Sequence, residues 1–209
     1  LHSFPTRRSS DLTCLFCNQH QISGVKQQLP SAQQITDTVL QWLERSPHRA
    51  TEVAFYGGSF TLLPQKQQEQ LLYAVQPLIE QQLVKSIRIS TRPDALEQAA
   101  LEFLAERKVA TIEIGVQSLD EQVLLKSNRG HTAVDSLAAI QRVKAAGFQV
   151  GAQLLPGLPG DSQAKALASV QGVLAAGVEF VRIYPAVVLS GTALADQFKA
   201  GQYQPPDLE

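Results

Sequence analysis

Short apolar segments alternate with amphipathic segments along most of this chain, and this alternation limits the fold more than any other feature. The apolar segments have the length of buried strands, at 52–56, 87–91, 110–116, 148–155 and 179–184. Helical periodicity fills the intervals between them. Strand, helix and strand units of this size imply parallel pairing with right-handed crossovers. The sequence therefore predicts an α/β fold, and periodicity alone allows either an open doubly wound sheet or a barrel.

Local signals mark where the predicted helices begin and end. Ser31 with Gln34 forms a capping box, and Asp161 is predicted to cap the helix before the last strand. Pro77 is predicted to kink a helix, and Gly147 is predicted to end another one as a C-cap glycine.

The loops that follow the strands build the site in either architecture, because the carboxyl ends of parallel strands share one edge. These loops hold the most unusual local sequence in the chain. They are Gly57-Gly58-Ser59, Thr91-Arg92-Pro93, Gln117-Ser118, Pro156-Gly157-Leu158-Pro159-Gly160 and Tyr184-Pro185.

The composition is that of one soluble globular domain, with 209 residues, 44% hydrophobic residues and 18% charged residues. The formal net charge of -1 gives no broad electrostatic footprint for nucleic acid, although a local groove would escape this count. No apolar stretch is long enough to span a bilayer, so no membrane partner is predicted. Two cysteines are too few for a disulfide framework, which favours a reducing cytoplasm.

Cys14 and Cys17 are the only cysteines, and two residues separate them. That spacing brings both sulfurs to one side of a turn, where they can chelate a metal or cluster iron or can form a disulfide. Taken alone, the pair leaves four alternatives open: half of a zinc site, a redox dithiol, an iron-sulfur site and inert buried thiols.

Residues 2–12 read as the translation of a common sequencing adapter, and the alternative is a natural polar N-terminal arm that contains arginine. We therefore divide the chain into a non-native segment, 1–12, and a domain, 13–209, and exclude the first from fold reasoning. Because the chain starts at Leu1 and holds no methionine, we expect it to be a fragment or a processed piece.

Several loop and strand residues are candidate binding groups, each with a plainer alternative. Gly57-Gly58-Ser59 could let backbone N–H groups approach an anionic or amino-acid ligand, or could be an ordinary turn. Gln117 could bind a ribose or carboxylate, or could cap a helix. Arg129 could pair with a ligand carboxylate, although an isolated arginine is more often on the surface. Gln153, in an apolar strand, faces a barrel interior or satisfies backbone groups. Ser90 is similarly ambiguous, and His131 is interpreted as structural or exposed.

Taken together, these segments resemble those of the radical S-adenosylmethionine (SAM) enzymes, and most closely those of bacterial proteins similar to the Elongator catalytic subunit. The resemblance runs from Thr13 to the end of the chain, with each segment at a predicted strand end. Its segments are Cys14-Leu15-Phe16-Cys17, Phe55-Tyr56-Gly57-Gly58-Ser59-Phe60-Thr61, Ser90-Thr91-Arg92-Pro93-Asp94, Gly115-Val116-Gln117-Ser118, Asn128-Arg129-Gly130-His131, Leu155-Pro156-Gly157-Leu158-Pro159-Gly160 and Val181-Arg182-Ile183-Tyr184-Pro185.

The resemblance implies a partial (βα)6 barrel, truncated at both ends, with five of the six strands present. It also implies a 4Fe-4S cluster held by three cysteines spaced C-x-x-x-C-x-x-C, with SAM on the open iron. Cleavage of SAM by an electron from an external donor would give a 5'-deoxyadenosyl radical. By this resemblance Cys14 and Cys17 are cluster ligands, and Phe16 is the aromatic residue before the last ligand.

The same resemblance places the other candidates around SAM. Gly57, Gly58 and Ser59 would receive the methionine amino end, whereas Gln117, Arg129 and Gln153 would contact the ribose or carboxylate. Ser90 occupies a position that is often Glu in relatives.

The chain departs from the family where the first cluster ligand is expected, because Ser10 stands four residues before Cys14. A chain with two thiolates is expected to be inactive even if its parent is an enzyme. The functions that follow are a radical SAM enzyme acting on tRNA, a small-molecule enzyme similar to coproporphyrinogen oxidase, and a non-catalytic zinc or dithiol domain. The sequence gives no indication of oligomeric state.

Overall fold

A parallel sheet of six strands forms the centre of the molecule, in the order β1-β2-β3-β4-β5-β6. The computed structural model describes residues 2–5, 14–17, 29–45 and 52–206. The strands are β1 (His2–Pro5), β2 (Glu52–Tyr56), β3 (Ser86–Thr91), β4 (Val109–Gln117), β5 (Gln149–Leu154) and β6 (Phe180–Ile183). Because the order is sequential and does not reverse, the sheet has the topology of a partial (βα)6 barrel rather than of a doubly wound sheet.

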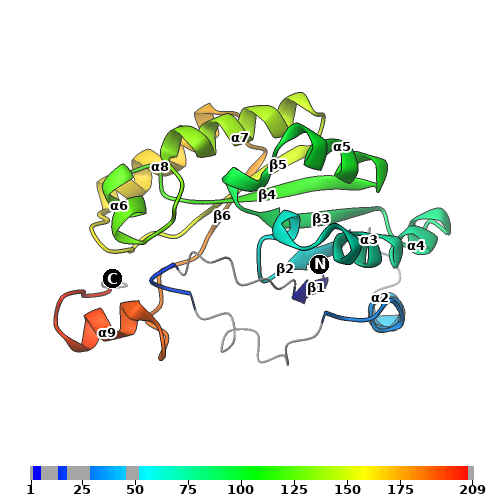
Figure 1. Cartoon of the computed structure of the whole chain (residues 1–209), viewed down its shortest axis with the longest axis horizontal. Coiled ribbons are helices and arrows are strands. Elements are labelled where there is room, and N and C mark those ends of the chain that lie inside the picture. The colour runs from blue at the N-terminus through cyan, green and yellow to red at the C-terminus, as the bar shows by residue number, and fades with distance from the viewer. Residues whose placement is uncertain (1, 6–13, 18–28, 46–51, 207–209) are drawn as a thin grey trace.

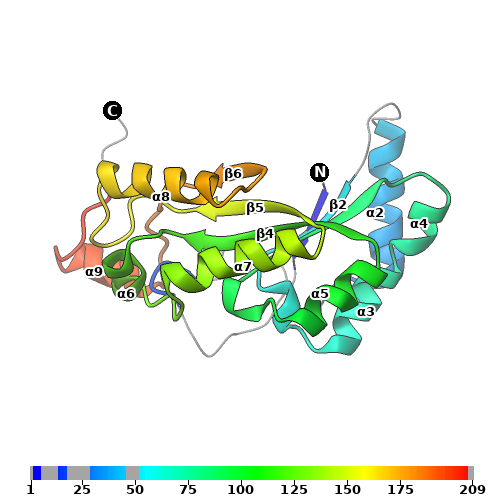
Figure 2. The same ribbon diagram turned by 90° about the horizontal axis from the view of Figure 1, so that it is seen from above.

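Helices connect the strands and cover the outer face of the sheet. Figure 1 shows α5, α7 and α8 on one side of the sheet, whereas α9 and residues 14–17 lie on the other. Seen from above, α7 and α8 run alongside β4 and β5 (Figure 2). The helices are α2 (Ala32–Arg45), α3 (Gln65–Tyr73), α4 (Gln76–Glu80), α5 (Gln98–Glu106), α6 (Glu121–Lys126), α7 (Ala133–Ala145), α8 (Gln163–Ala175) and α9 (Ala193–Lys199), with short 3-10 turns η1 (Phe60–Leu62) and η2 (Pro93–Ala95).

The two faces of the sheet differ in chemistry. Phe55, Ile89, Ile112 and Val150 lie in register on β2 to β5 and are fully buried in the core beneath the helices. Because side chains alternate along a strand, the neighbouring positions form the opposite face. That face is polar, with Glu52, Tyr56, Arg88, Ser90, Thr111, Glu113, Gln153 and Arg182. This polar face is the inner side of the partial barrel.

The predicted fold class is confirmed, and the five predicted strands correspond to β2 to β6. The strand count is one short, because β1 pairs with β2 and lies in the segment set aside as adapter-derived. The edge of a parallel sheet offers unpaired N–H and C=O groups that a short extended segment can satisfy with little regard to its sequence. The origin of residues 1–12 itself stays a prediction.

Most helix signals are confirmed. The Ser31 backbone N–H donates to Gln34 Oε1 at 2.8 Å, and the Gln34 N–H donates to Ser31 Oγ at 3.2 Å. Pro77 lies at the start of α4, where the helix is broken from α3. The prediction for Asp161 is wrong: Ser162 caps α8, because Asp161 instead accepts the N–H groups of Gly157 and Ser162 in the preceding loop.

Candidate functional site

The Cys14–Cys17 segment forms a tight turn on the polar side of the sheet. The Cys17 N–H donates to Cys14 O at 3.1 Å, and no disulfide joins the two cysteines. Two further backbone hydrogen bonds hold Leu15, from its N–H to Ser127 O at 3.2 Å and from the Leu194 N–H to its carbonyl at 2.9 Å. The predicted turn is therefore present, fixed between the end of α6 and the start of α9.

Phe16 anchors the same turn through its ring. It packs against a small apolar cluster of Val123, Leu158 and Ala186, and the Arg129 guanidinium carbon lies 6.0 Å from its ring centroid. Phe16 thus links the cysteine turn to Arg129, a second predicted site residue.

Arg129 is buried, with 6% of its surface exposed, so the plainer interpretation of a surface arginine is wrong. Its Nη1 donates to Cys14 Sγ at 3.2 Å, and its Nη2 donates to Gly115 O at 2.8 Å. Within the described residues its buried Nε has no hydrogen-bond partner. A buried guanidinium with an unused donor is costly, which makes it a strong candidate for a ligand contact.

The backbone around Arg129 explains its position. Asn128 and Gly130 have φ values of 52° and 71°, so the chain turns sharply between α6 and α7 on either side of Arg129. Arg92 Nη2 donates to the Arg129 carbonyl at 2.9 Å, while a bidentate pair with Asp94 holds Arg92 in place. Burial lowers the pKa of Arg129, and the nearby Cys14 sulfur opposes that shift.

Gln117 and Arg129 meet over Gly115. A Cβ atom at Gly115 would lie 3.0 Å from Gln117 Nε2 and 3.5 Å from Arg129 Nη2, so the glycine leaves space that both side chains use. Gln117 itself has φ 68° at the end of β4. A non-glycine residue in this region is uncommon and occurs often at functional sites.

Of the remaining predicted residues, Ser90 and Gln153 lie on the polar face, and the glycine loop follows the end of β2. Gly57 has φ 97° directly after β2, and Gly58 and Ser59 are half-buried in the loop that leads to η1. Ser90 is buried on β3, in register with Glu113. Gln153 donates to Glu113 Oε2 at 2.8 Å, so of its two alternatives the structure favours the barrel interior.

Sequence reasoning missed a buried charged network on the polar face, here called the Glu113 cluster: Glu52, Tyr56, Arg88, Glu113, Gln153 and Arg182. Glu113 is fully buried and accepts hydrogen bonds from four of these side chains. Arg88 also pairs with Glu52 at 2.6 Å. A detectable signal existed, because charged residues stand at positions 88, 113 and 182 within three of the predicted strands.

Of the two interpretations of His131, structural or exposed, the structure excludes the second, because His131 is buried against β4 with its Nε2 3.4 Å from Val116 O. Burial and the charge of Arg129 lower its pKa from 6.5 to about 4.

Since the unfolded state binds the His131 proton more tightly than the folded state, stability is lost as the pH falls below the pKa of the unfolded state. As the pH falls from about 7.5 to about 5, we expect the low pKa of His131 in the folded state to reduce the free energy of unfolding by about 2 kcal/mol. Urea unfolding at both pH values should show this loss in the native chain and not in His131→Gln; equal losses would contradict it.

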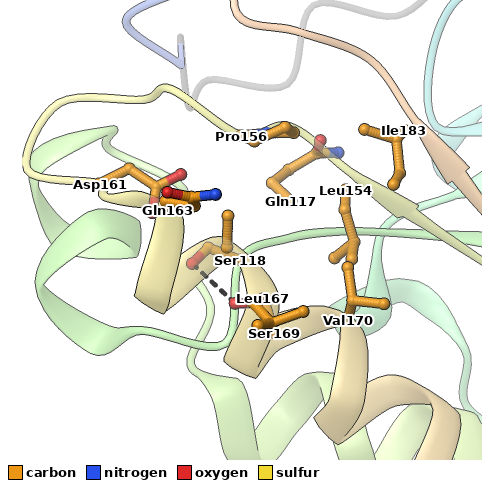
Figure 3. A pocket seen from close by; sticks show the side chains of 11 residues that line it. Gln117, Ser118, Leu154, Pro156, Asp161, Gln163, Leu167, Ser169, Val170 and Ile183 are labelled. Atoms are coloured by element: carbon orange, nitrogen blue, oxygen red, sulfur yellow. Dashed lines mark hydrogen bonds between the residues drawn. The ribbon is translucent and has the colours of Figure 1, made fainter. Parts of the chain in front are cut away.

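An apolar cavity of about 210 Å³ lies on the other, helix-covered side, between α8 and the ends of β4, β5 and β6. Figure 3 shows Leu154, Val170 and Ile183 around it, with the Ser118 and Ser169 hydroxyls 3.4 Å apart. Gln117 is the one predicted site residue that lines this cavity, so the cavity adjoins the site on the polar face at that residue.

A comparison with protein families gives a match over residues 8–171 to the Radical SAM superfamily. The chain belongs to this superfamily. Members generally use a 4Fe-4S cluster and SAM, so family membership supports an enzyme. An uncharacterized protein of Methanocaldococcus jannaschii is 29% identical over 202 residues, covering 93% of this chain and 62% of its own length.

Two further relatives carry names that describe tRNA chemistry or Elongator proteins. A tRNA uridine(34) acetyltransferase of Methanocaldococcus infernus is 32% identical over 120 residues, covering 56% of this chain and 22% of that protein. The solved structure of the Methanocaldococcus infernus Elp3 with an N-terminal deletion has a TM-score of 0.71 and 26% identity, covering 82% of this chain and 46% of that one. The chain thus spans about three fifths of the length of the first curated relatives it matches.

The radical SAM chain offers an incomplete ligand set for a cluster. It has two cysteines, and Ser10 occupies the position that the family pattern gives to the first ligand. Within the described residues, no three His, Cys, Asp or Glu side chains come together as a metal site. Every helix in the same residues is too short or too polar to cross a membrane.

Proposed function

We propose that this chain is the SAM-binding core of a radical enzyme that modifies tRNA. The observation that carries the SAM part is the buried Arg129 guanidinium. Its Nη2 lies beside Gly115 and Gln117, and its Nε lacks a partner in the described residues. A carboxylate is the natural acceptor for such a donor, because arginine binds carboxylates through charge-assisted hydrogen bonds. SAM carries one carboxylate on its methionine end.

The other predicted residues fit the remaining parts of the same ligand. The loop Gly57-Gly58-Ser59 follows β2 with little side-chain bulk, which suits the approach of the methionine amino group. Gln117, next to Arg129, has an amide suited to a ribose hydroxyl. Ser90 and Gln153 would complete the polar surroundings from β3 and β5.

The cluster part of the proposal depends on residue 10. Cys14 and Cys17 would supply two thiolates, and a cysteine at position 10 would supply the third. With such a cluster bound, an external electron donor would drive one-electron cleavage of the SAM sulfonium. The chain with Ser10 lacks that third thiolate, so we expect it to be inactive.

The tRNA part rests on the relatives. The name of the tRNA uridine(34) acetyltransferase describes action on tRNA. That protein is 32% identical to this chain over 120 residues. We take tRNA as the substrate class by this similarity.

Arg129→Gln tests the SAM site directly. In a chain carrying Ser10→Cys and loaded with iron and sulfide, we expect the substitution to weaken SAM binding by about tenfold to hundredfold, since it removes charge-assisted hydrogen bonds. Isothermal titration with SAM measures the change. Arg45→Gln, which removes an exposed arginine at the end of α2, is the matched control. Equal affinities in the two variants, with both folded by thermal unfolding, would refute the assignment.

A further inference from the structure

The Glu113 cluster separates its charges by depth. Glu113 has no exposed side-chain surface, whereas the Arg182 side chain is 33% exposed. Arg88 is only 12% exposed and is also neutralised by Glu52. The negative charge of Glu113 is therefore buried, whereas the positive charge of Arg182 is partly exposed to solvent at the β6 side of the polar face.

Glu113 and Tyr56 hold the Arg182 guanidinium in one orientation. Nε and Nη2 donate to the two Glu113 carboxylate oxygens at 3.0 and 2.9 Å, and Nη2 also reaches the Tyr56 hydroxyl at 3.2 Å. The Tyr56 ring lies 5.6 Å from the guanidinium carbon. A bidentate pair with a stacked ring fixes the plane of an arginine, so little conformational entropy is left to lose on binding a ligand.

One end of this guanidinium is unused. Within the described part of the chain, no hydrogen bond involves Arg182 Nη1. Glu113 does not depend on Arg182 alone, because Tyr56, Arg88 and Gln153 also donate to it. Arg182 is partly exposed, yet Glu113 and Tyr56 hold its guanidinium in one orientation. This arrangement is expected of a residue that recognises a ligand.

We propose that Arg182 anchors an oxyanion of the substrate, a phosphate or a carboxylate, through its free Nη1 edge. Tyr56 and Glu113 act as positioning residues for it. Tyr56 immediately precedes the Gly57-Gly58-Ser59 loop, so an anion on Arg182 would lie on the same face of the sheet as the SAM site. This inference rests on the proposed function and adds to it the residue that holds the substrate.

The test compares Arg182→Gln with Arg182→Lys and with the control Arg45→Gln. The two probes are a fluorescein-labelled RNA hairpin with an unpaired uridine, followed by anisotropy, and coproporphyrin, a tetracarboxylate, followed by its own fluorescence. If the oxyanion is a phosphate, Arg182→Gln weakens RNA binding about tenfold. It also makes the negative slope of log affinity against log salt concentration shallower by about 0.7, because one phosphate contact is lost. Arg182→Lys keeps the slope, because it keeps the charge, but binds the RNA more weakly, because lysine lacks the planar guanidinium edge that Glu113 and Tyr56 orient.

If the oxyanion is a carboxylate, coproporphyrin binding falls about tenfold instead and RNA binding is unchanged. A merely structural role for Arg182 would not change the salt slope. The proposal is overturned if Arg182→Gln and Arg45→Gln bind both probes with the same affinity and slope. Should Arg182→Gln fail to fold, loss of binding in Arg182→Lys at unchanged thermal stability still supports it, and unchanged binding there overturns it.

SAM titration of the iron-loaded Ser10→Cys chain separates this inference from the proposed function. Failure of that chain to bind SAM would refute the proposed function. SAM binding combined with unchanged oxyanion binding in the Arg182 variants would refute this inference alone.

Discussion

Replacing Ser10 with cysteine should convert a chain that retains little iron into one that holds about four irons, with broad absorption near 400 nm. The physical reason is ligand count. Cys14 and Cys17 already lie in a fixed turn, and a third thiolate at position 10 completes the family spacing. Anaerobic reconstitution with iron and sulfide, followed by desalting and iron analysis, measures the change.

Ser9→Cys is the matched control for this experiment. It adds the same thiol one residue away, with the wrong spacing to Cys14. Equal iron retention by Ser9→Cys and Ser10→Cys would argue against a spaced cluster site. Tight zinc binding by the unsubstituted chain, with no iron uptake by Ser10→Cys, would instead favour a zinc domain.

Glu113→Gln is expected to lower the unfolding free energy by about 3 kcal/mol or more, because it leaves buried arginine charge without its counter-ion. Burial alone would raise the pKa of Glu113, but hydrogen bonds from Arg182, Tyr56, Gln153 and Arg88 outweigh it and hold the pKa below its usual value. The carboxylate is therefore ionised at neutral pH. The stability that ionised Glu113 contributes is fully present above the pKa it has in the unfolded state, and it is lost as the pH falls through its lower pKa in the folded state.

Urea unfolding at neutral pH measures this loss. Glu102→Gln on α5 is the control, because Glu102 is exposed and its carboxylate accepts a hydrogen bond from Gln98 of the same helix. This substitution should change stability by less than about 0.5 kcal/mol. The double variant Glu113→Gln with Arg182→Gln should recover part of the loss, since it also removes the unpaired cation. Equal losses for the two glutamates would show that the Glu113 cluster does not depend on its central charge.

The fold was largely predictable from sequence because its signals are local. Alternating apolar strands and capping residues such as Ser31 depend on neighbours a few positions away, so β2 to β6 appear where the pattern places them. β1 was missed for a different reason. Its pairing depends on the open edge of β2 rather than on a pattern within residues 2–5.

The candidate site was predictable only in part. The motifs predicted Cys14, Cys17, Gln117 and Arg129 as site residues. For Arg129 the residues alone left a ligand contact and a surface position open, because its burial depends on how the chain between α6 and α7 packs against β4. Glu113 and Arg182 are separated by 69 residues and meet only because β4, β5 and β6 lie side by side. No local window contains both charges.

The sequence by itself therefore determined the α/β class, the order of the strands and helices, and the segments that carry the cysteines and the glycine loops. The tertiary structure alone decided that Arg129 lies against the Cys14 sulfur and Gly115, and that Glu113 is buried while Arg182 faces outward. The reason is that secondary structure follows from the period of apolar residues along the chain, whereas the balance of buried charge depends on which distant strands become neighbours.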